Sequence, residues 1–162
     1  MKFSQISDFL TKRSNSLLRF VFLIVGGVLT GLTLVFTKVG FLEWITLIPM
    51  AVVLLVRASD RGVKLRSLYL DGFVFYYSYY LVCYHWFVNL YPLEFIDGMT
   101  KGSALAVVIV AWFGLALLQA LMGGCVFVIA GILFRCNLSQ KLPLLRVFVA
   151  AGLWAAFEWS QT

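Results

Sequence analysis

The chain has 162 residues, of which 62% are hydrophobic and only 12% are charged. A water-soluble domain of this length cannot bury so much apolar side chain in its own core, so the composition excludes a soluble enzyme and predicts a protein that works in a bilayer. The formal net charge is +6, but no basic run alternates with aromatic residues, so nucleic acid is not an expected partner.

Five apolar segments follow one another along the chain, and each is interpreted as a membrane-spanning helix. A helix needs about 20 apolar residues to cross about 30 Å of hydrocarbon, so five helices and short connections use the whole length. The expected fold class is therefore all-α, a polytopic bundle of about five transmembrane helices forming one domain, 1–162. The expected helices cover residues 17–36, 41–56, 68–88, 102–134 and 143–159.

The distribution of basic residues predicts how the chain is oriented. When the connections are assigned alternately to two sides, eleven of the 13 lysines and arginines share one side, and only Lys38 and Lys101 fall on the other. Basic loops stay in the cytoplasm, so the N-terminus is expected inside and Thr162 outside. The first apolar run is long and no small-residue cleavage pattern follows it, so it is expected to be an uncleaved anchor. The eleven are Lys2, Lys12, Arg13, Arg19, Arg57, Arg61, Lys64, Arg66, Arg135, Lys141 and Arg146.

The same charge bias favours a single helix over residues 102–134, which at about 1.5 Å per residue is longer than a bilayer is thick. A kink is expected at Gly123–Gly124. Small residues at four-residue spacing predict close helix contacts in three helices. These residues are Gly27 and Gly31, then Ala116, Ala120 and Gly124, then Ala151/Ala155 and Gly152/Ala156.

The third helix carries Asp71, Ser78 and His85 at seven-residue spacing, which places them on one face. Their types suggest a catalytic triad, but seven residues span roughly 10 Å along a helix, whereas a nucleophile and its base lie about 3 Å apart. The three residues are therefore predicted to form a polar stripe. The stripe faces either a headgroup cleft or polar groups on neighbouring helices, and Asp71 is also within reach of Arg66 or Lys64.

Aromatic residues give the third helix its other pattern, since Tyr76, Tyr80 and Tyr84 line up at four-residue spacing. They are expected to pack against a neighbouring helix with their hydroxyls bonded, and a lipid-facing aromatic wall is the alternative. The cysteines, Cys83 and Cys125 among them, have no CxxC or metal-ligand spacing, so neither a metal, a cofactor nor a catalytic thiol is expected.

A polar and aromatic rim is expected at the outer boundary of the membrane, because indole rings favour the headgroup layer. Glu158 lies there near water, where its carboxylate is free to orient a loop or contact a headgroup amine. The residues expected to line a lipid or substrate rim are Trp44, Trp86, Tyr91, Glu158 and Trp159.

In their order, these segments resemble the N-terminal membrane half of bacterial apolipoprotein N-acyltransferase. The resemblance rests on a glycine-rich first helix, a short second helix containing Pro49, an aromatic third helix and a long fourth helix. It ends with a Trp-x3-Glu segment formed by Trp154 and Glu158. A divergent homologue and a fragment of a longer homologue are both compatible with these residues.

The resemblance implies an activity, a location and partners. The complete enzyme would move an acyl chain from a membrane phospholipid to the N-terminal amine of a diacylated lipoprotein, at the bacterial cytoplasmic membrane. Its chemistry would belong to a nitrilase-like domain with a Glu-Lys-Cys triad, outside the membrane. No residue of this chain corresponds to that triad, so the chain is expected to hold no catalytic residue and to be inactive alone.

Two other classes remain open. A small transporter or channel needs ionisable residues at mid-membrane, and the main polar groups expected there are Gln119 and Ser78. A membrane assembly protein without catalytic activity needs no such group.

Overall fold

The computed structural model of the chain describes residues 16–94, 96, 98–136 and 143–159, and the described part contains helices and connections only. The expected all-α fold is confirmed. Lys2, Lys12, Arg13, Lys141 and Thr162 lie outside the described residues. The elements are α2 (Ser16–Val35), the 3₁₀ helix η2 (Thr37–Leu42), α3 (Glu43–Thr46), α4 (Ile48–Ser59), α5 (Leu65–Cys83), the 3₁₀ helix η3 (Tyr84–Leu90), α6 (Lys101–Phe134) and α8 (Pro143–Trp159).

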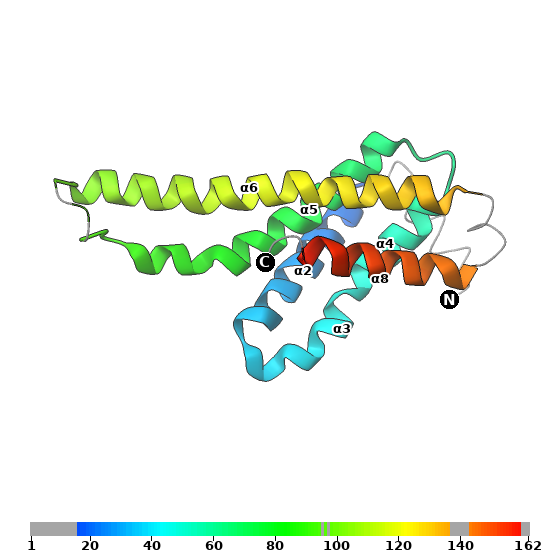
Figure 1. Ribbon diagram of the computed structural model, residues 1–162, viewed down its shortest axis with the longest axis horizontal. Helices are drawn as coiled ribbons and strands as arrows, with labels where there is room; N and C mark the ends of the chain where they lie inside the picture. Colours follow the sequence, from blue (N-terminus) through cyan, green and yellow to red (C-terminus); the bar gives the residue numbers. More distant parts are fainter. Residues whose placement is uncertain (1–15, 95, 97, 137–142, 160–162) are drawn as a thin grey trace.

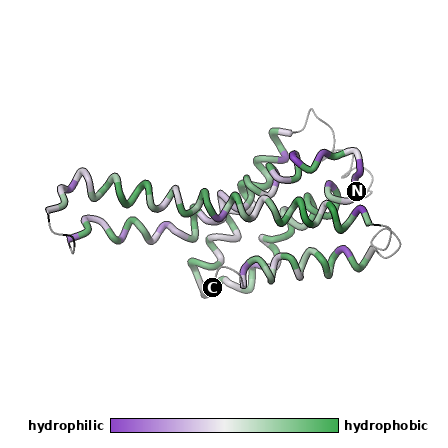
Figure 2. The backbone as a smooth tube through the Cα atoms, turned by 45° about the horizontal axis from the view of Figure 1, so that its top comes forward, coloured by the Kyte–Doolittle hydropathy of each residue, from purple (hydrophilic) through white to green (hydrophobic). Residues whose placement is uncertain are grey.

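Hydrophobic residues make up most of the length of the helices (Figure 2). Leucine, valine, isoleucine and phenylalanine side chains on the outer faces of α2, α6 and α8 are exposed, as they are in a protein whose solvent is lipid. By length and composition, three described helical segments are long and apolar enough to cross a membrane. These segments are Ser16–Val35, Lys38–Ser59 and Lys101–Phe134. The chain is therefore a membrane protein.

Helix α5 is the centre of the bundle, because α2 packs along one side of it and α6 along another (Figure 1). The C-terminal part of α5 continues with α6 into one arm, and the hairpin of α2, η2, α3 and α4 forms a second arm that diverges from the first. Helix α8 lies against α4, α5 and α6, with its C-terminal end between the two arms.

Helices α2 and α5 run parallel and approach closely at the two glycines predicted to lie at a contact. A Cβ on Gly27 would lie 2.5 Å from the Phe75 carbonyl oxygen, and a Cβ on Gly31 would lie 2.7 Å from the Val82 side chain. Glycine therefore allows the two backbones to approach, which in lipid is the main source of helix association. The prediction for the first helix is confirmed.

Helix α6 packs antiparallel to α5 through its own small residues. Ala116 and Ala120 are fully buried, and Gly124 lies against the ring of Tyr69. The prediction for the fourth helix is therefore confirmed. The prediction for the fifth helix is wrong, because Gly152 has no atom near its Cβ position and Ala151, Ala155 and Ala156 are exposed. Helix α8 docks instead through the larger side chains of Trp154 and Phe157.

The expected kink at Gly123–Gly124 is absent, since α6 is an unbroken α-helix that runs straight in Figure 1. A Cβ on Gly123 would overlap the ring of Tyr76. These two glycines therefore make room for tyrosine rings on α5, and their role is packing. The expectation that one helix covers this region is confirmed, and it begins with a cap at Thr100, whose hydroxyl accepts a hydrogen bond from the Ser103 amide.

Two other helices differ from their expected bounds. The segment expected as one helix over 41–56 is a 3₁₀ turn followed by α3 and α4, with the α-helix restarting beside Pro49, which lacks a backbone N–H. The helix expected over 68–88 begins at Leu65 and changes to 3₁₀ after Cys83. In that last segment Phe87 packs against the first turns of α6.

The contact between α2 and α5 gives a direct test. Gly27→Ala is expected to lower the free energy of unfolding by about 1–3 kcal/mol, because the new methyl group overlaps backbone and side-chain atoms of α5. Gly114→Ala is the matched control, since its Cβ would meet open space. Unfolding midpoints in detergent would be compared, and equal midpoints for the two variants would contradict the close approach described here.

Candidate functional site

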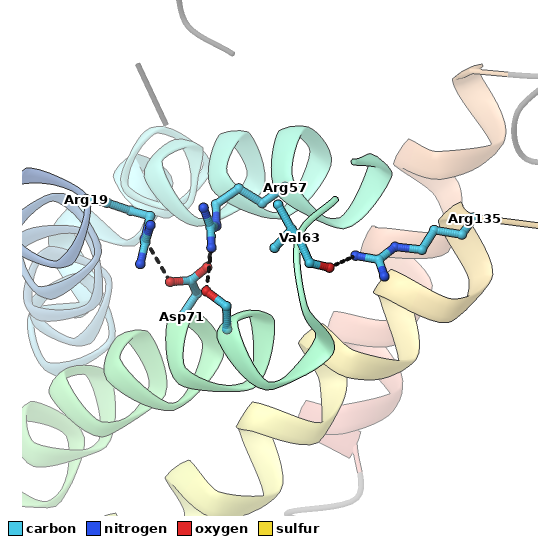
Figure 3. A network of polar contacts seen from close by, with 6 residues as sticks. Arg19, Arg57, Val63, Asp71 and Arg135 are labelled. Atoms are coloured by element: carbon cyan, nitrogen blue, oxygen red, sulfur yellow. Dashed lines mark hydrogen bonds and ion pairs between the residues drawn. The ribbon is translucent and has the colours of Figure 1, made fainter. Parts of the chain in front are cut away.

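A buried cluster of charges joins three helices at the end of the bundle where α5 begins (Figure 3). The Arg57 Nε–H on α4 donates to Asp71 Oδ2 at 2.6 Å, and the Arg57 Nη2 group donates to the Ser67 hydroxyl at 2.6 Å. Arg19 Nε on α2 lies 2.9 Å from Asp71 Oδ1, an ion pair without hydrogen-bond alignment. Asp71 is fully buried, so a single carboxylate compensates two guanidinium groups.

More arginines close the same end of the molecule. Arg135, just after α6, donates to the carbonyl oxygens of Ala58 at 3.2 Å and Val63 at 2.7 Å, which ties α6 to the turn between α4 and α5. Arg146 on α8 donates to the Ser59 hydroxyl at 2.9 Å. The described arginines that were assigned to one side of the membrane are thus brought together at one end. The arginines at this basic end stabilise the fold, because their guanidinium groups bind carbonyl and hydroxyl oxygens of the chain itself.

A second polar group lies among aromatic rings where α8 packs on α5. Tyr76 is fully buried, with its ring centroid 5.6 Å from that of Trp154 and 4.8 Å from that of Phe157. Tyr80 packs on Phe157 at 6.5 Å. The half-buried carboxylate of Glu158 follows Phe157 at the end of α8. We call this the tyrosine–carboxylate cluster: Tyr76, Tyr79, Tyr80, Trp154, Phe157 and Glu158.

The tyrosines were expected to pack against a neighbouring helix with their hydroxyls hydrogen-bonded. The packing is confirmed, but the hydrogen bonding is confirmed for one hydroxyl only. Their rings are packed against neighbouring helices, and the Tyr84 hydroxyl accepts a hydrogen bond from Gln119 Nε2 at 3.3 Å. The hydroxyls of Tyr76 and Tyr80 have no hydrogen-bond partner among the described residues.

The predicted polar stripe is not continuous in the structure. Asp71 bonds to α2 and α4, with Arg19 and Arg57 in place of the expected Arg66 or Lys64. Ser78 donates to the carbonyl oxygen of Val74 in its own helix at 2.7 Å. His85 is exposed and lies beyond the end of α5, with Nδ1 2.9 Å from the carbonyl oxygen of Val82. The change to a 3₁₀ helix at Tyr84 separates His85 from the face that carries the other two.

The residues predicted to line a rim lie on three separate parts of the fold. Trp44 is on α3 and is 84% exposed, and Trp159 ends α8 and is 81% exposed. Trp86 and Tyr91 are exposed near the far end of the α5–α6 arm. Only Glu158 lies against the aromatic core of the bundle. Within the described parts of the chain, no three or more His, Cys, Asp or Glu side chains group closely enough to hold a metal ion.

Sequence reasoning missed Arg19 and Arg57 as partners of Asp71. The sequence did contain a signal for these partners, because Asp71 lies in an apolar helix and basic residues lie at the ends of other helices.

Comparison with known proteins adds one relationship. Over 134 residues, 83% of its length, the chain is 31% identical to a protein of Gloeobacter violaceus described as "Apolipoprotein N-acyltransferase". The two sequences are distant homologues. The match covers 23% of the Gloeobacter protein, so the chain spans about a quarter of the length of this relative. No protein-family model matches the chain, and no solved structure matches it.

The charge cluster at Asp71 makes a quantitative prediction. Asp71→Asn removes the carboxylate that contacts both Arg19 and Arg57, and it is expected to cost about 3–5 kcal/mol of unfolding free energy, because two buried guanidinium groups lose their shared counter-charge. Glu94→Gln, which removes an exposed loop carboxylate, is the control and is expected to change little.

A triple variant separates charge balance from a general intolerance of substitution at these positions. Arg19→Met/Arg57→Met/Asp71→Leu removes all the charges and is expected to recover most of the stability lost in Asp71→Asn. Thermal unfolding in detergent ranks the variants by their stability. An unfolding midpoint of Asp71→Asn equal to that of the Glu94→Gln control would show that the cluster does not hold the helices together.

Proposed function

We propose that the chain is the membrane portion of an apolipoprotein N-acyltransferase-like protein. The complete enzyme would transfer an acyl chain from phospholipid to the N-terminal amine of a diacylated lipoprotein. The identity with the Gloeobacter protein over most of this chain carries the proposal. The apolar helices agree with it, because substrates that carry acyl chains must be met within the bilayer.

In this proposal, the chain binds and positions substrates and takes no part in bond making. Its residues would form a single transmembrane domain, with the N-terminus in the cytoplasm of a bacterial cell and the C-terminal end of α8 outside. A nitrilase-like domain supplied by the rest of the protein would carry the nucleophile and its base. No cofactor is needed for transfer of an acyl group through a thioester.

The proposed site for acyl chains lies at the end of the molecule where α3, η3 and the end of α8 carry exposed aromatic side chains. Support for it comes from the exposed tryptophans on each part, since indole rings favour the boundary between hydrocarbon and headgroups. The opposite end carries the exposed side chains of Arg61, Lys64 and Arg66, which would meet anionic headgroups of the inner leaflet. The proposed rim therefore comprises Trp44, Trp86, Tyr91, Glu158 and Trp159.

Photoreactive phospholipids test the rim and the orientation together. Probes confined to the outer leaflet of vesicles are expected to label peptides that contain Trp44, Trp86 or Trp159, because these side chains are exposed at the proposed outer boundary. Probes confined to the inner leaflet are expected to label the basic end near Arg57 and Arg146. Outer-leaflet label found only at the basic end would reverse the proposed orientation and remove the rim.

The acyl-transfer assignment is tested by the gene from which the sequence comes. The reading frame around the codons for residues 1–162 is expected to encode further helices and a nitrilase-like domain with Glu, Lys and Cys. The protein it encodes is expected to transfer a labelled acyl chain from phospholipid to a diacylated lipopeptide, and residues 1–162 alone are expected to yield no product. A reading frame that stops at Thr162 would refute the assignment.

A further inference from the structure

The two arms of the bundle start at the same basic end and differ in length. Helix α2 has 20 residues and is about 30 Å long, which matches the hydrocarbon of a bilayer when the helix stands upright. Helix α6 has 34 residues and is about 50 Å long. If α6 also stood upright with Phe134 at the inner boundary, the hydrocarbon would end about 20 residues earlier, near Gly114. The residues before Gly114 would then project beyond the membrane.

The part of the α5–α6 arm that would project has an apolar surface. We call this part the outer arm: η3, the described residues of the loop after it, and residues 101–113 of α6. No aspartate, glutamate, lysine or arginine occurs between Lys101 and Arg135 or at positions 72–93. An exposed apolar surface of this kind marks contact with a membrane or with another protein. The large hydrophobic side chains exposed on the outer arm are those of Trp86, Val88, Tyr91, Ile96, Leu105, Val107, Ile109, Val110 and Phe113.

The apolar surface of the outer arm continues into the part of α6 that lies in the hydrocarbon in either orientation. A row of exposed side chains at four-residue spacing follows one face of the helix past Gly114. The row consists of Leu105, Ile109, Phe113, Leu117 and Leu121. Neither the exposure nor the residue type changes where an upright helix would leave the hydrocarbon. This continuity with a lipid-facing surface favours lipid as the material that covers the outer arm.

Groups typical of a membrane boundary lie at the far ends of both arms. The shorter arm ends with the exposed side chains of Lys38 on η2 and Trp44 on α3. The longer arm ends with the exposed side chains of Trp86 on η3 and Lys101 at the start of α6. Indole rings and basic side chains gather in the headgroup layer. Because both arms start at the basic end, they reach the same outer boundary only if the longer arm is inclined.

The shape of the bundle provides this inclination. The two arms diverge in Figure 1, so both cannot stand along the membrane normal. The uncharged stretch of α6 fits within 30 Å of hydrocarbon when the helix axis is inclined by about 50° from the normal. Membrane helices are usually tilted by no more than about 40°, and packing against neighbouring helices sets the angle. Helix α6 packs along α5, and the direction of α5 in the arm therefore determines the larger angle of α6.

We propose that α6 crosses the bilayer obliquely and that the outer arm is an interaction surface for lipid acyl chains in the leaflet opposite the basic end. Trp86 and Tyr91 then lie at the same depth as Trp44, in the headgroup layer above those chains. This inference deepens the proposed rim, because only an inclined α6 brings its residues from both arms into one plane. It rests on the membrane location of the chain and does not require acyl transfer.

Spin labels on single cysteines measure the depth of the outer arm in phosphatidylcholine vesicles. Leu105→Cys and the matched control Ile129→Cys carry the label at exposed positions near opposite ends of α6, in a chain whose native cysteines are replaced. For an oblique helix both labels lie just inside the hydrocarbon. Their ratios of collision with oxygen to collision with a water-soluble nickel chelate are therefore expected to agree within about threefold. For an upright helix, Leu105 would lie beyond the headgroups, and its ratio would be at least about tenfold lower than that of the control.

Two results would overturn the proposal. Frequent collision of the Leu105→Cys label with the nickel chelate would show that the outer arm projects into water. Shielding of that label from both reagents would show that protein, such as a second copy of the chain, covers the arm in place of lipid. Ile109→Cys, in the same exposed row, replaces Leu105→Cys if that variant does not fold, and its label is expected to lie deeper in the hydrocarbon. Either contrary result removes Trp86 and Tyr91 from the rim and leaves the acyl-transfer assignment standing, because no reading depends on acyl transfer.

Discussion

The bundle depends on the pairing of Asp71 with two arginines from other helices. A buried carboxylate in a membrane protein requires a cationic partner, and Arg19 and Arg57 supply two from α2 and α4. Their positions fix how α2 and α4 are turned about α5. Once α2 is turned in this way, Gly27 and Gly31 face α5 farther along the same interface, and the two backbones approach closely. The charge cluster and the glycine contact are therefore consecutive parts of one interface.

The sequence was sufficient to predict the parts of the fold that depend on hydrophobic length. The long helix α6 was predicted within one residue at its start, and the small residues on α2 and α6 were predicted to pack because close approach needs small side chains. The same rule failed for α8, where Gly152 and its alanines face outward. A small residue permits a close contact but does not require one, and the rings of Trp154 and Phe157 provided a larger surface to bury.

The candidate site was less predictable, since it depends on which helices become neighbours. The importance of Asp71 followed from its type and its place in an apolar helix, whereas its partners lie 52 residues before it and 14 residues before it in the sequence. The seven-residue spacing of Asp71, Ser78 and His85 places them on one face only if the α-helix continues to His85. The α-helix ends at Cys83, so the prediction failed for His85. The packing of Tyr76 against Trp154 and Phe157 depends on where α8 docks, and no periodic pattern encodes it.

The bond from Arg135 to the turn between α4 and α5 has a consequence for the order of folding during synthesis. The donors for the carbonyl groups of Ala58 and Val63 lie more than 70 residues later in the chain. A ribosome that has made only α2, α4 and α5 has therefore not yet produced the group that binds the turn between α4 and α5. This part of the protein acquires its final form after α6 has entered the membrane, which makes the insertion of α6 the event that commits the earlier helices to their assembled state.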